Sequence, residues 1–238
     1  ANQVEDGFEQ ITDYKKAEKV LDQAKESTCV GAVIFQNTEN VLPLFANEAA
    51  IGGIGLCFDE EHAYCIEVTE QITKEFLLEK LSKLNESCGR FVMFDIKEAM
   101  KWLPIKNQKH CFDATVAAYL LNPLKNDYTY EDVAREQLNI VIEEKSEAYV
   151  KVCYEAYTAF KGSDLLYKKL EETQMLHLFE DIEMPLVFTL YDMERNGIRA
   201  EGEALKVYSS QLGGRISELE KEIYEMAGES FNINSPKQ

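Results

Sequence analysis

Runs of apolar residues in the first half of the chain predict a sheet with helices between its strands. Residues 29–35 (CVGAVIF) form an unbroken apolar run of the kind found in strands that are buried on both faces. Further strands are predicted near residue 8 and at 51–58, 63–68 and 90–94. Apolar residues spaced three and four positions apart predict helices at 14–25, 74–84 and 96–103.

The pattern becomes helical after Asp113. Asp113 is a suitable N-cap for a helix at 114–121, and Thr129 for a helix that runs to Leu138. Two more helices are expected near 144–160 and 163–179, separated by Gly162 and with Ser163 as the cap of the second. Strands followed by helices predict an α/β fold, with a mixed sheet flanked by helices and then a helical layer.

The residues after 181 have a pattern of their own. A helix at 182–195 is expected to end at Asn196-Gly197, and a second helix, 202–227, to stop at Gly228. Gly213-Gly214 interrupts the second helix and weakens its pattern locally. Its apolar positions form a one-sided stripe that needs a partner: Leu205, Tyr208, Leu212, Ile216, Leu219, Ile223 and Met226. Because the chain ends soon after this stripe, we expect it to be part of a longer protein.

Composition narrows the class of protein. Apolar residues make up 45% and charged residues 29% of the 238 residues, as in globular proteins with a substantial core. No apolar run approaches the ~20 residues of a membrane-spanning helix, so no contact with a membrane is expected. The six cysteines are scattered and form no CxxC pair, which argues against a zinc site. We expect a reducing, cytoplasmic location.

The net charge of −18 bears on nucleic-acid binding. A domain that grips phosphates by itself is expected to be basic, because each contact replaces a counterion of the nucleic acid. This chain would repel DNA at long range. Either the protein does not contact nucleic acid, or the contacting part lies elsewhere in a longer chain.

Residues 182–238 contain three short motifs in order: IEMPL at 182–186, MERNGI at 193–198 and AGESFNINSPKQ at 227–238. They resemble motifs of family A DNA polymerases of the bacterial polymerase I type. In that family an I-E-x-P-L segment opens the polymerase domain, an M-E-x-x-G-[IV] turn and a long helix follow, and then A-G-x-x-F-N-[IL]-x-S-x-K-Q. The matching residues are Ile182, Glu183, Pro185, Leu186, Met193, Glu194, Gly197, Ile198, Ala227, Gly228, Phe231, Asn232, Ser235, Lys237 and Gln238. Amphipathicity alone does not require a tail such as FNINSPKQ.

The resemblance extends upstream and implies a domain organisation. Residues 112–123 (FDATVAAYLLNP) are similar to the family's F-D-T-x-x-x-x-Y-[IL]-L-[ND]-P. The family carries a 3′–5′ exonuclease-like domain of the ribonuclease-H-like fold just before the polymerase domain. We therefore expect residues 1–180 to form a degenerate exonuclease-like domain. Residues 181–238 would be the truncated N-terminal part of the polymerase domain, a helical segment that begins its thumb.

Exonucleases of this type hold two divalent metals with four carboxylates, since Mg²⁺ and Mn²⁺ prefer charged oxygen ligands. The first motif, D-x-E, ends the first long strand. Here the likeness puts Phe35 and Asn37 at its two acidic positions, or Gln36 and Thr38 if the register shifts by one. Neither register supplies a carboxylate.

The second motif, N-x-x-x-D, follows the strand at 90–94. The likeness puts Asp95 at its Asn position and Ala99 at its Asp position. The acid of this motif is therefore also missing.

Two registers compete for the third motif, Y-x-x-x-D. Tyr149 with Cys153 keeps the tyrosine, whereas Lys151 with Glu155 keeps an acid. The distance to the polymerase motifs favours the second, which leaves Glu155 as a lone carboxylate. At least three of the four ligands are then absent, which predicts neither bound metal nor proofreading. The alternative is an active exonuclease that uses Asp95, Glu98, Asp113 and Glu155.

The resemblance also implies partners and cofactors. The longer protein would bind DNA through its polymerase domain and use Mg²⁺, whereas this chain would hold no cofactor and bind DNA weakly or not at all. The family places the C-terminal motif near the base of the thumb, which makes Asn234, Ser235 and Lys237 candidates for contact with the DNA backbone. A stand-alone interaction module is the remaining alternative.

Overall fold

The computed structural model describes residues 3–37, 50–125 and 128–235. The chain divides into two compact units, Ala1–Glu194 and Arg195–Gln238. The first unit contains a six-stranded sheet in the order β1-β4-β3-β2-β5-β6. The strands are β1 (Phe8–Ile11), β2 (Cys29–Gln36), β3 (Ile51–Cys57), β4 (Ala63–Glu67), β5 (Arg90–Met93) and β6 (Cys111–Asp113).

The sheet is mixed, as predicted. The β2–β3 and β3–β4 pairs are antiparallel, whereas β1–β4, β2–β5 and β5–β6 are parallel. All the predicted strands are present within two residues of their expected ends. Strand β6 was not predicted, because it is three residues long and only its pairing with β5 makes it a strand.

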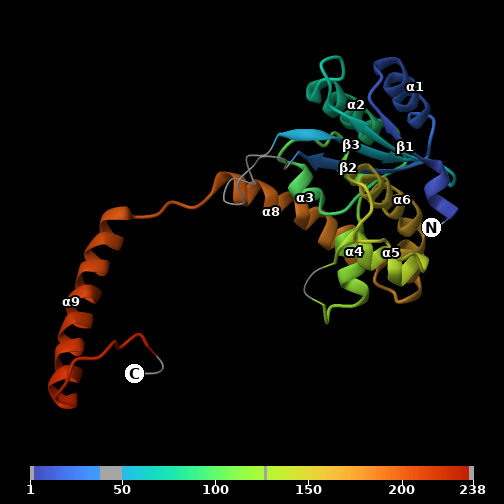
Figure 1. Cartoon of the computed structure of the whole chain (residues 1–238). Helices are drawn as coiled ribbons and strands as arrows, with labels where there is room; N and C mark the ends of the chain where they lie inside the picture. The colour runs from blue at the N-terminus through green and yellow to red at the C-terminus, as the bar shows by residue number, and fades with distance from the viewer. Residues whose placement is uncertain (1–2, 38–49, 126–127, 236–238) are drawn as a thin grey trace. The chain divides into compact units, whose positions relative to one another are not determined.

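Helices cover both faces of the sheet (Figure 1). Helices α1 (Tyr14–Ala24) and α2 (Lys74–Ser87) lie on one face, and α6 (Ala148–Glu172) lies on the other with α4 (Ala114–Leu121) and α5 (Tyr130–Leu138) beside it. Short 3₁₀ turns at Gln3–Gly7 (η1) and Gln108–His110 (η3) complete the unit. The predicted caps are confirmed, since Asp113 accepts from Thr115 and Val116, and Thr129 forms a capping box.

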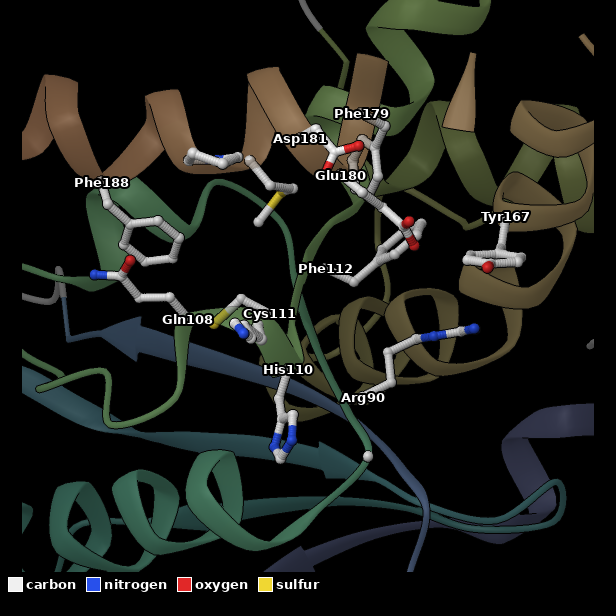
Figure 2. Close-up of a pocket in the computed structure, with 14 residues that line it drawn as sticks. Arg90, Gln108, His110, Cys111, Phe112, Tyr167, Phe179, Glu180, Asp181 and Phe188 are labelled. Atoms are coloured by element: carbon white, nitrogen blue, oxygen red, sulfur yellow. The ribbon is translucent and has the colours of Figure 1, made fainter. Parts of the chain in front are cut away.

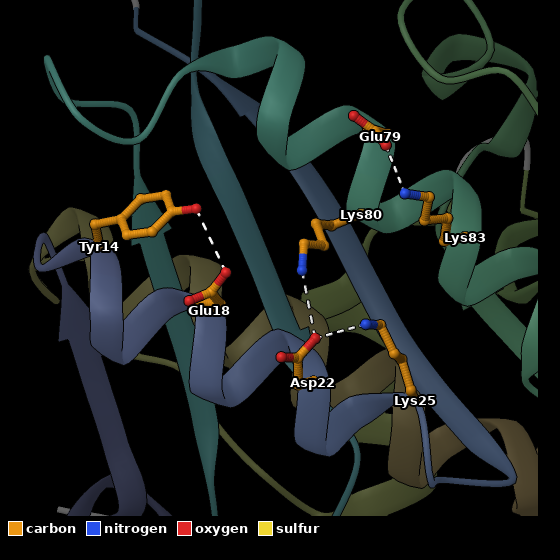
Figure 3. Close-up of polar contacts among 7 residues, drawn as sticks. All are labelled: Tyr14, Glu18, Asp22, Lys25, Glu79, Lys80 and Lys83. Carbon is orange, nitrogen blue, oxygen red and sulfur yellow. Dashed lines mark hydrogen bonds and ion pairs between the residues drawn. The ribbon is translucent and has the colours of Figure 1, made fainter.

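One ion pair joins the two helices of the first face, between Asp22 of α1 and Lys80 of α2 (Figure 3). Asp22 accepts hydrogen bonds from Lys25 of its own helix (2.5 Å) and from Lys80 of α2 (3.3 Å). The hydrogen bond from Lys25, followed by that from Lys80, lowers the pKa of Asp22. An exposed ion pair of this kind contributes at most about 1 kcal/mol, so apolar packing dominates the placement of α1 and α2.

The two helices expected at 144–160 and 163–179 are one continuous helix, α6, so this prediction is wrong. Gly162 lies buried in its interior, and Ser163 donates to the carbonyl oxygen of Phe160 (2.8 Å) and caps nothing. Ten residues of α6 are buried. That burial outweighs the helix-propensity cost of one glycine, about 1 kcal/mol. Another predicted helix, 96–103, is shorter than expected, since α3 covers only Ile96–Ala99.

Several more helices follow α6 along the chain. Helix α7 (Leu176–Leu178), the π-helical segment η4 (Phe179–Glu183) and α8 (Met184–Asn196) follow one another, and α9 (Gly202–Ala227) belongs to the second unit. Gly197 and Gly228 have φ of 66° and 72°, which confirms the predicted helix ends. The domain boundary expected after residue 180 falls inside η4 and stays a prediction. Among the described helices, none is both long and apolar enough to cross a membrane.

Candidate nuclease site

The end of strand β2 presents an aromatic ring at one of the two positions where the resemblance predicts the first acid. The alternative register uses Gln36, also in β2, and Thr38, which lies outside the described residues. Phe35 is half-buried, and its ring lies against Gly52 and Gly53 of β3. A Cβ added to either glycine would meet the ring at 2.7 Å, so the ring fits because these residues have no side chain. Asn37 is exposed, and its backbone N–H donates to the carbonyl oxygen of Ala50 (2.9 Å).

The end of strand β5 leads into α3 through Asp95. This residue adopts the left-handed conformation (φ 51°) and caps α3 by accepting from the N–H of Glu98 (3.2 Å). Ala99, one turn later, is buried among core residues. The two predicted positions of the second motif thus flank α3, just after β5. The Asp95 carboxylate is engaged as the N-cap, and Ala99 has no carboxylate.

Asp113 is a buried carboxylate close to Asp95, but its oxygens are already in use. One oxygen accepts from the N–H of Ile96 (2.8 Å), and the other accepts from those of Thr115 (2.9 Å) and Val116 (3.2 Å). Burial raises the pKa of Asp113 to about 6 against the effect of these hydrogen bonds. Asp113 therefore links the first turns of α3 and α4, and this role is structural.

Glu155 lies on α6 beside two residues that the sequence did not single out, Tyr130 and Glu131 of α5. Burial, and then the charge of Glu131, raise the pKa of Glu155 to about 7. The ring of Tyr130 contacts Phe94 at the end of β5, with centroids 6.4 Å apart. The sequence predicted Tyr130 and Glu131 only as the first turn of a helix. No local sequence signal shows which distant residues will pack against that turn.

The residues of the competing register, Tyr149 and Cys153, belong to a different environment. Cys153 is fully buried in an apolar cluster with Val33 and Cys57, and Tyr149 packs against this cluster. The assignment of Glu155 to the third motif stays a prediction.

No group of three or more His, Cys, Asp or Glu side chains that could hold a metal ion occurs in the described part of the chain. The four residues of the rearranged alternative show why. Glu98 pairs with Lys101, Asp95 and Asp113 cap helices, and Glu155 lies beside α5. The donor set here does not fit a pair of hard divalent cations.

Helix α8 contacts the helix that follows β5. Lys97 of α3 pairs with Glu194 (2.7 Å), and the hydroxyl of Tyr191 donates to the carbonyl oxygen of Met100 (2.9 Å). A small pocket of about 290 Å³ remains between Asp95, Asp113 and the side chains of α8. Helix α8 is thus anchored beside α3 and the turn at Asp95.

The C-terminal candidates lie in the second unit. The N–H of exposed Asn234 donates to the side chain of Asn232 (3.1 Å), and that of Ser235 donates to the carbonyl oxygen of Asn232 (2.9 Å). Lys237 lies outside the described residues. Contact of these three residues with DNA stays a prediction.

Known proteins with similar sequences are DNA polymerases. The chain is 34% identical over 152 residues to DNA polymerase I of Caldicellulosiruptor bescii (62% of the chain, 17% of that protein). It is 35% identical over 205 residues to that of Bacillus subtilis (76% and 22%), and 30% over 241 residues to that of Borreliella burgdorferi (92% and 26%). The chain thus spans about a quarter or less of these relatives. No protein-family model matches it.

Two solved structures illustrate the similarity in fold. One is the POL domain of Pol1 from M. smegmatis, in complex with DNA primer-template and dNTP, with a TM-score of 0.73 at 20% identity. The match covers 96% of the present chain and 39% of the Pol1 chain. The other is NrnC from Brucella melitensis, with a TM-score of 0.58 at 14% identity. This match covers 80% of the present chain and 93% of the NrnC chain. The fold is therefore the predicted ribonuclease-H-like exonuclease fold followed by helices. By sequence, the chain belongs to the bacterial DNA polymerase I family, and it corresponds to one part of these longer proteins.

Proposed function

We propose that this chain is a non-catalytic, supporting part of a DNA-directed DNA polymerase of DNA replication and repair. The observation that carries the proposal is the ring of Phe35, which fills the space over Gly52 and Gly53 at the end of β2. An apolar ring at this point excludes the ions that a D-x-E motif would bind. The domain keeps its fold, because the sheet and α6 do not depend on the metal ligands.

Electrostatics supports the same conclusion. Two divalent cations need several charged oxygen ligands to replace their bound water. Glu155 is the one acidic residue retained from the motifs, and its pKa near 7 leaves it partly protonated at neutral pH. Asp113 is engaged by three backbone N–H groups, so its oxygens are committed to the starts of α3 and α4.

For the longer protein we propose the activity that its relatives' name implies, the extension of a DNA primer in the cytoplasm with Mg²⁺ as cofactor. DNA would bind through the polymerase domain. The net charge of −18 supports weak or no binding by this chain itself, because it repels phosphates at long range.

A nuclease assay tests the proposal. The 238-residue chain is incubated with a 5′-labelled single-stranded oligonucleotide and Mn²⁺, with the Glu155→Gln variant and an EDTA sample as controls. We expect all three samples to show the same background. Efficient 3′ trimming by the wild-type chain that EDTA and Glu155→Gln abolish would establish the alternative, a 3′–5′ exonuclease with rearranged ligands.

A further inference from the structure

The aromatic side chains of the first unit are covered within that unit. Figure 2 shows several of them around a cavity of about 680 Å³ at the start of β5 and β6. Phe112 and Phe179 lie with their ring centroids 4.8 Å apart and are only 3% and 2% exposed. The Arg90 guanidinium lies over the ring of Tyr167 (4.7 Å to its centroid) and pairs with Asp164 (2.7 Å). The apolar surface around this cavity is therefore already in use.

Helix α9 of the second unit has the opposite property. It is ~39 Å long and none of its residues is buried. At about 100° per residue, the members of its apolar stripe lie within roughly 40° of one line along the helix. The stripe consists of Leu205, Tyr208, Leu212, Ile216, Leu219, Ile223 and Met226, which are between 37% and 79% exposed. Such a one-sided face is typical of a helix that packs against another helix.

The residues that follow α9 pack against a different side of it. The Tyr224 hydroxyl donates to the carbonyl oxygen of Phe231 (2.9 Å), and the centroids of the two rings are 5.5 Å apart. Tyr224 lies roughly 120° around the helix from the stripe. The described part of the second unit therefore leaves the stripe open.

The spacing of the stripe is the same in both directions along the helix. Counted from Leu205, the next stripe residues lie three and then four positions further on, and counted back from Met226 the steps are also three and then four. Two antiparallel copies can therefore align apolar residue to apolar residue, as a twofold-symmetric interface requires. The facing pairs are Leu205 with Met226, Tyr208 with Ile223 and Leu212 with Leu219, and the two Ile216 side chains meet at the axis.

Charge favours the antiparallel direction over the parallel one. Residues 195–214 carry three basic and two acidic side chains, whereas residues 215–234 carry two basic and five acidic ones. A parallel pair would place the two acidic halves side by side, whereas an antiparallel pair places each acidic half beside a weakly basic one. Because exposed charges contribute little energy, they select the direction and the apolar stripe supplies the affinity.

We propose that α9 is a self-association surface, through which two copies of this chain form an antiparallel helix pair with Ile216 at its centre. Seven exposed apolar side chains on each helix make an interface on the order of 1,000 Å² in total, which is the lower limit for a specific complex. The pair is therefore weak, with a dissociation constant in the micromolar range. A segment of a longer protein that covers the stripe would compete with it, so the test uses the 238-residue chain. The pairing does not depend on the loss of nuclease chemistry.

Sedimentation equilibrium measures the association of the whole chain. We expect the mean mass to rise from 27.2 kDa toward about twice that value as the protein concentration passes through the micromolar range. Ile216→Lys places two like charges at the axis, so it should weaken association at least about tenfold.

Val207→Lys is the matched control. Val207 is 58% exposed and Ile216 55%, both are β-branched residues of α9, and Val207 lies roughly 140° around the helix from the stripe. Far-UV circular dichroism checks that both variants keep their helices. A monomer at every concentration, association of Ile216→Lys equal to that of wild type, or an equal loss in Val207→Lys would overturn the proposal.

Disulfide cross-linking tests the direction of the pair. Tyr208 faces Ile223 only in the antiparallel arrangement, so Tyr208→Cys mixed with a tagged Ile223→Cys should form mixed cross-linked dimers under mild oxidation. Neither variant should cross-link to itself, and the unmodified chain is the background control, because its six cysteines are buried or half-buried. Cross-links within each variant alone, without mixed dimers, would show a parallel pair and contradict the proposal.

Discussion

Helices α6 and α9 have nearly the same length and opposite surroundings. Helix α6 has 25 residues and buries ten of them, whereas α9 has 26 residues and buries none. Both sequences repeat apolar residues every three or four positions. The periodicity shows which face of a helix is apolar, but only a partner surface decides whether that face is buried. In α6 the partner is the sheet, and in α9 the described residues supply none.

The glycines near the two helices show the same contrast. A Cβ at Gly31 of β2 would lie 2.3 Å from the carbonyl oxygen of Ala156 and 2.5 Å from the nitrogen of Phe160, both in the backbone of α6. A Cβ at Gly213 or Gly214 of α9 would meet nothing within 4 Å. A methyl group is therefore a steric test of each helix's surroundings.

The largest effect is expected for Gly31→Ala. The added methyl cannot be accommodated without a shift of α6 from the sheet, so we expect the free energy of unfolding to fall by about 3 kcal/mol. Urea unfolding followed by the fluorescence of Trp102 measures this, because the chain's single tryptophan lies in the first unit. A loss below about 0.5 kcal/mol would show that α6 is not pressed against β2.

A smaller, pH-dependent effect is expected for Glu155→Gln. Burial raises the pKa of Glu155 to about 7 from an ordinary value of 4.5, so the folded state favours the protonated acid. The stability that this group contributes is present in full below pH 4.5 and is lost as the pH rises through 7. A shift of the pKa from 4.5 to 7 corresponds to ~3.4 kcal/mol, and partial access of solvent to Glu155 reduces it, so at pH 8 the variant should be more stable than wild type by about 2 kcal/mol. At pH 4.5 the difference should be close to zero.

The same fluorescence titration at several pH values checks this prediction. The pKa of Asp113 is also raised, to about 6, so ionisation of Asp113 also lowers the stability of the fold as the pH rises. Because Asp113 is present in both proteins, its effect cancels in the difference between them. A stability difference that is equal at both pH values would show that Glu155 is not buried as a charge.

The smallest effect is expected for Gly213→Ala/Gly214→Ala. Each alanine favours an exposed helix over glycine by about 1 kcal/mol, so α9 should gain helicity at 222 nm. Because α9 belongs to the other compact unit, the Trp102 transition should keep its midpoint. A shift of that midpoint would show that α9 contributes to the stability of the first unit.

The sequence predicted most of the fold but only part of the candidate site. Strong local signals placed β2, the caps Asp113 and Thr129, and the end of α9 at Gly228. Phe35 lies near the end of β2 and Asp95 directly follows β5, and the apolar side chains of Phe35 and Ala99 need no structure to be recognised as unable to bind a metal. Their assignment to the nuclease motifs stays a prediction. Tyr130 and Glu131 beside Glu155 could not be predicted, since they approach it only when α5 packs against α6.

The sequence by itself thus determined local features: strand and helix types, most of the caps, the charge of −18, and the residue types at the ends of β2 and β5. The tertiary structure decided the rest. It carried α6 straight through Gly162, made a strand of residues 111–113, raised the pKa of Glu155, and brought the start of β5 and the segment η4 together around one cavity. The physical reason is the distance along the chain over which each interaction acts. Caps and periodicity depend on neighbours within a few residues, whereas burial and desolvation depend on segments that only the folded sheet brings together.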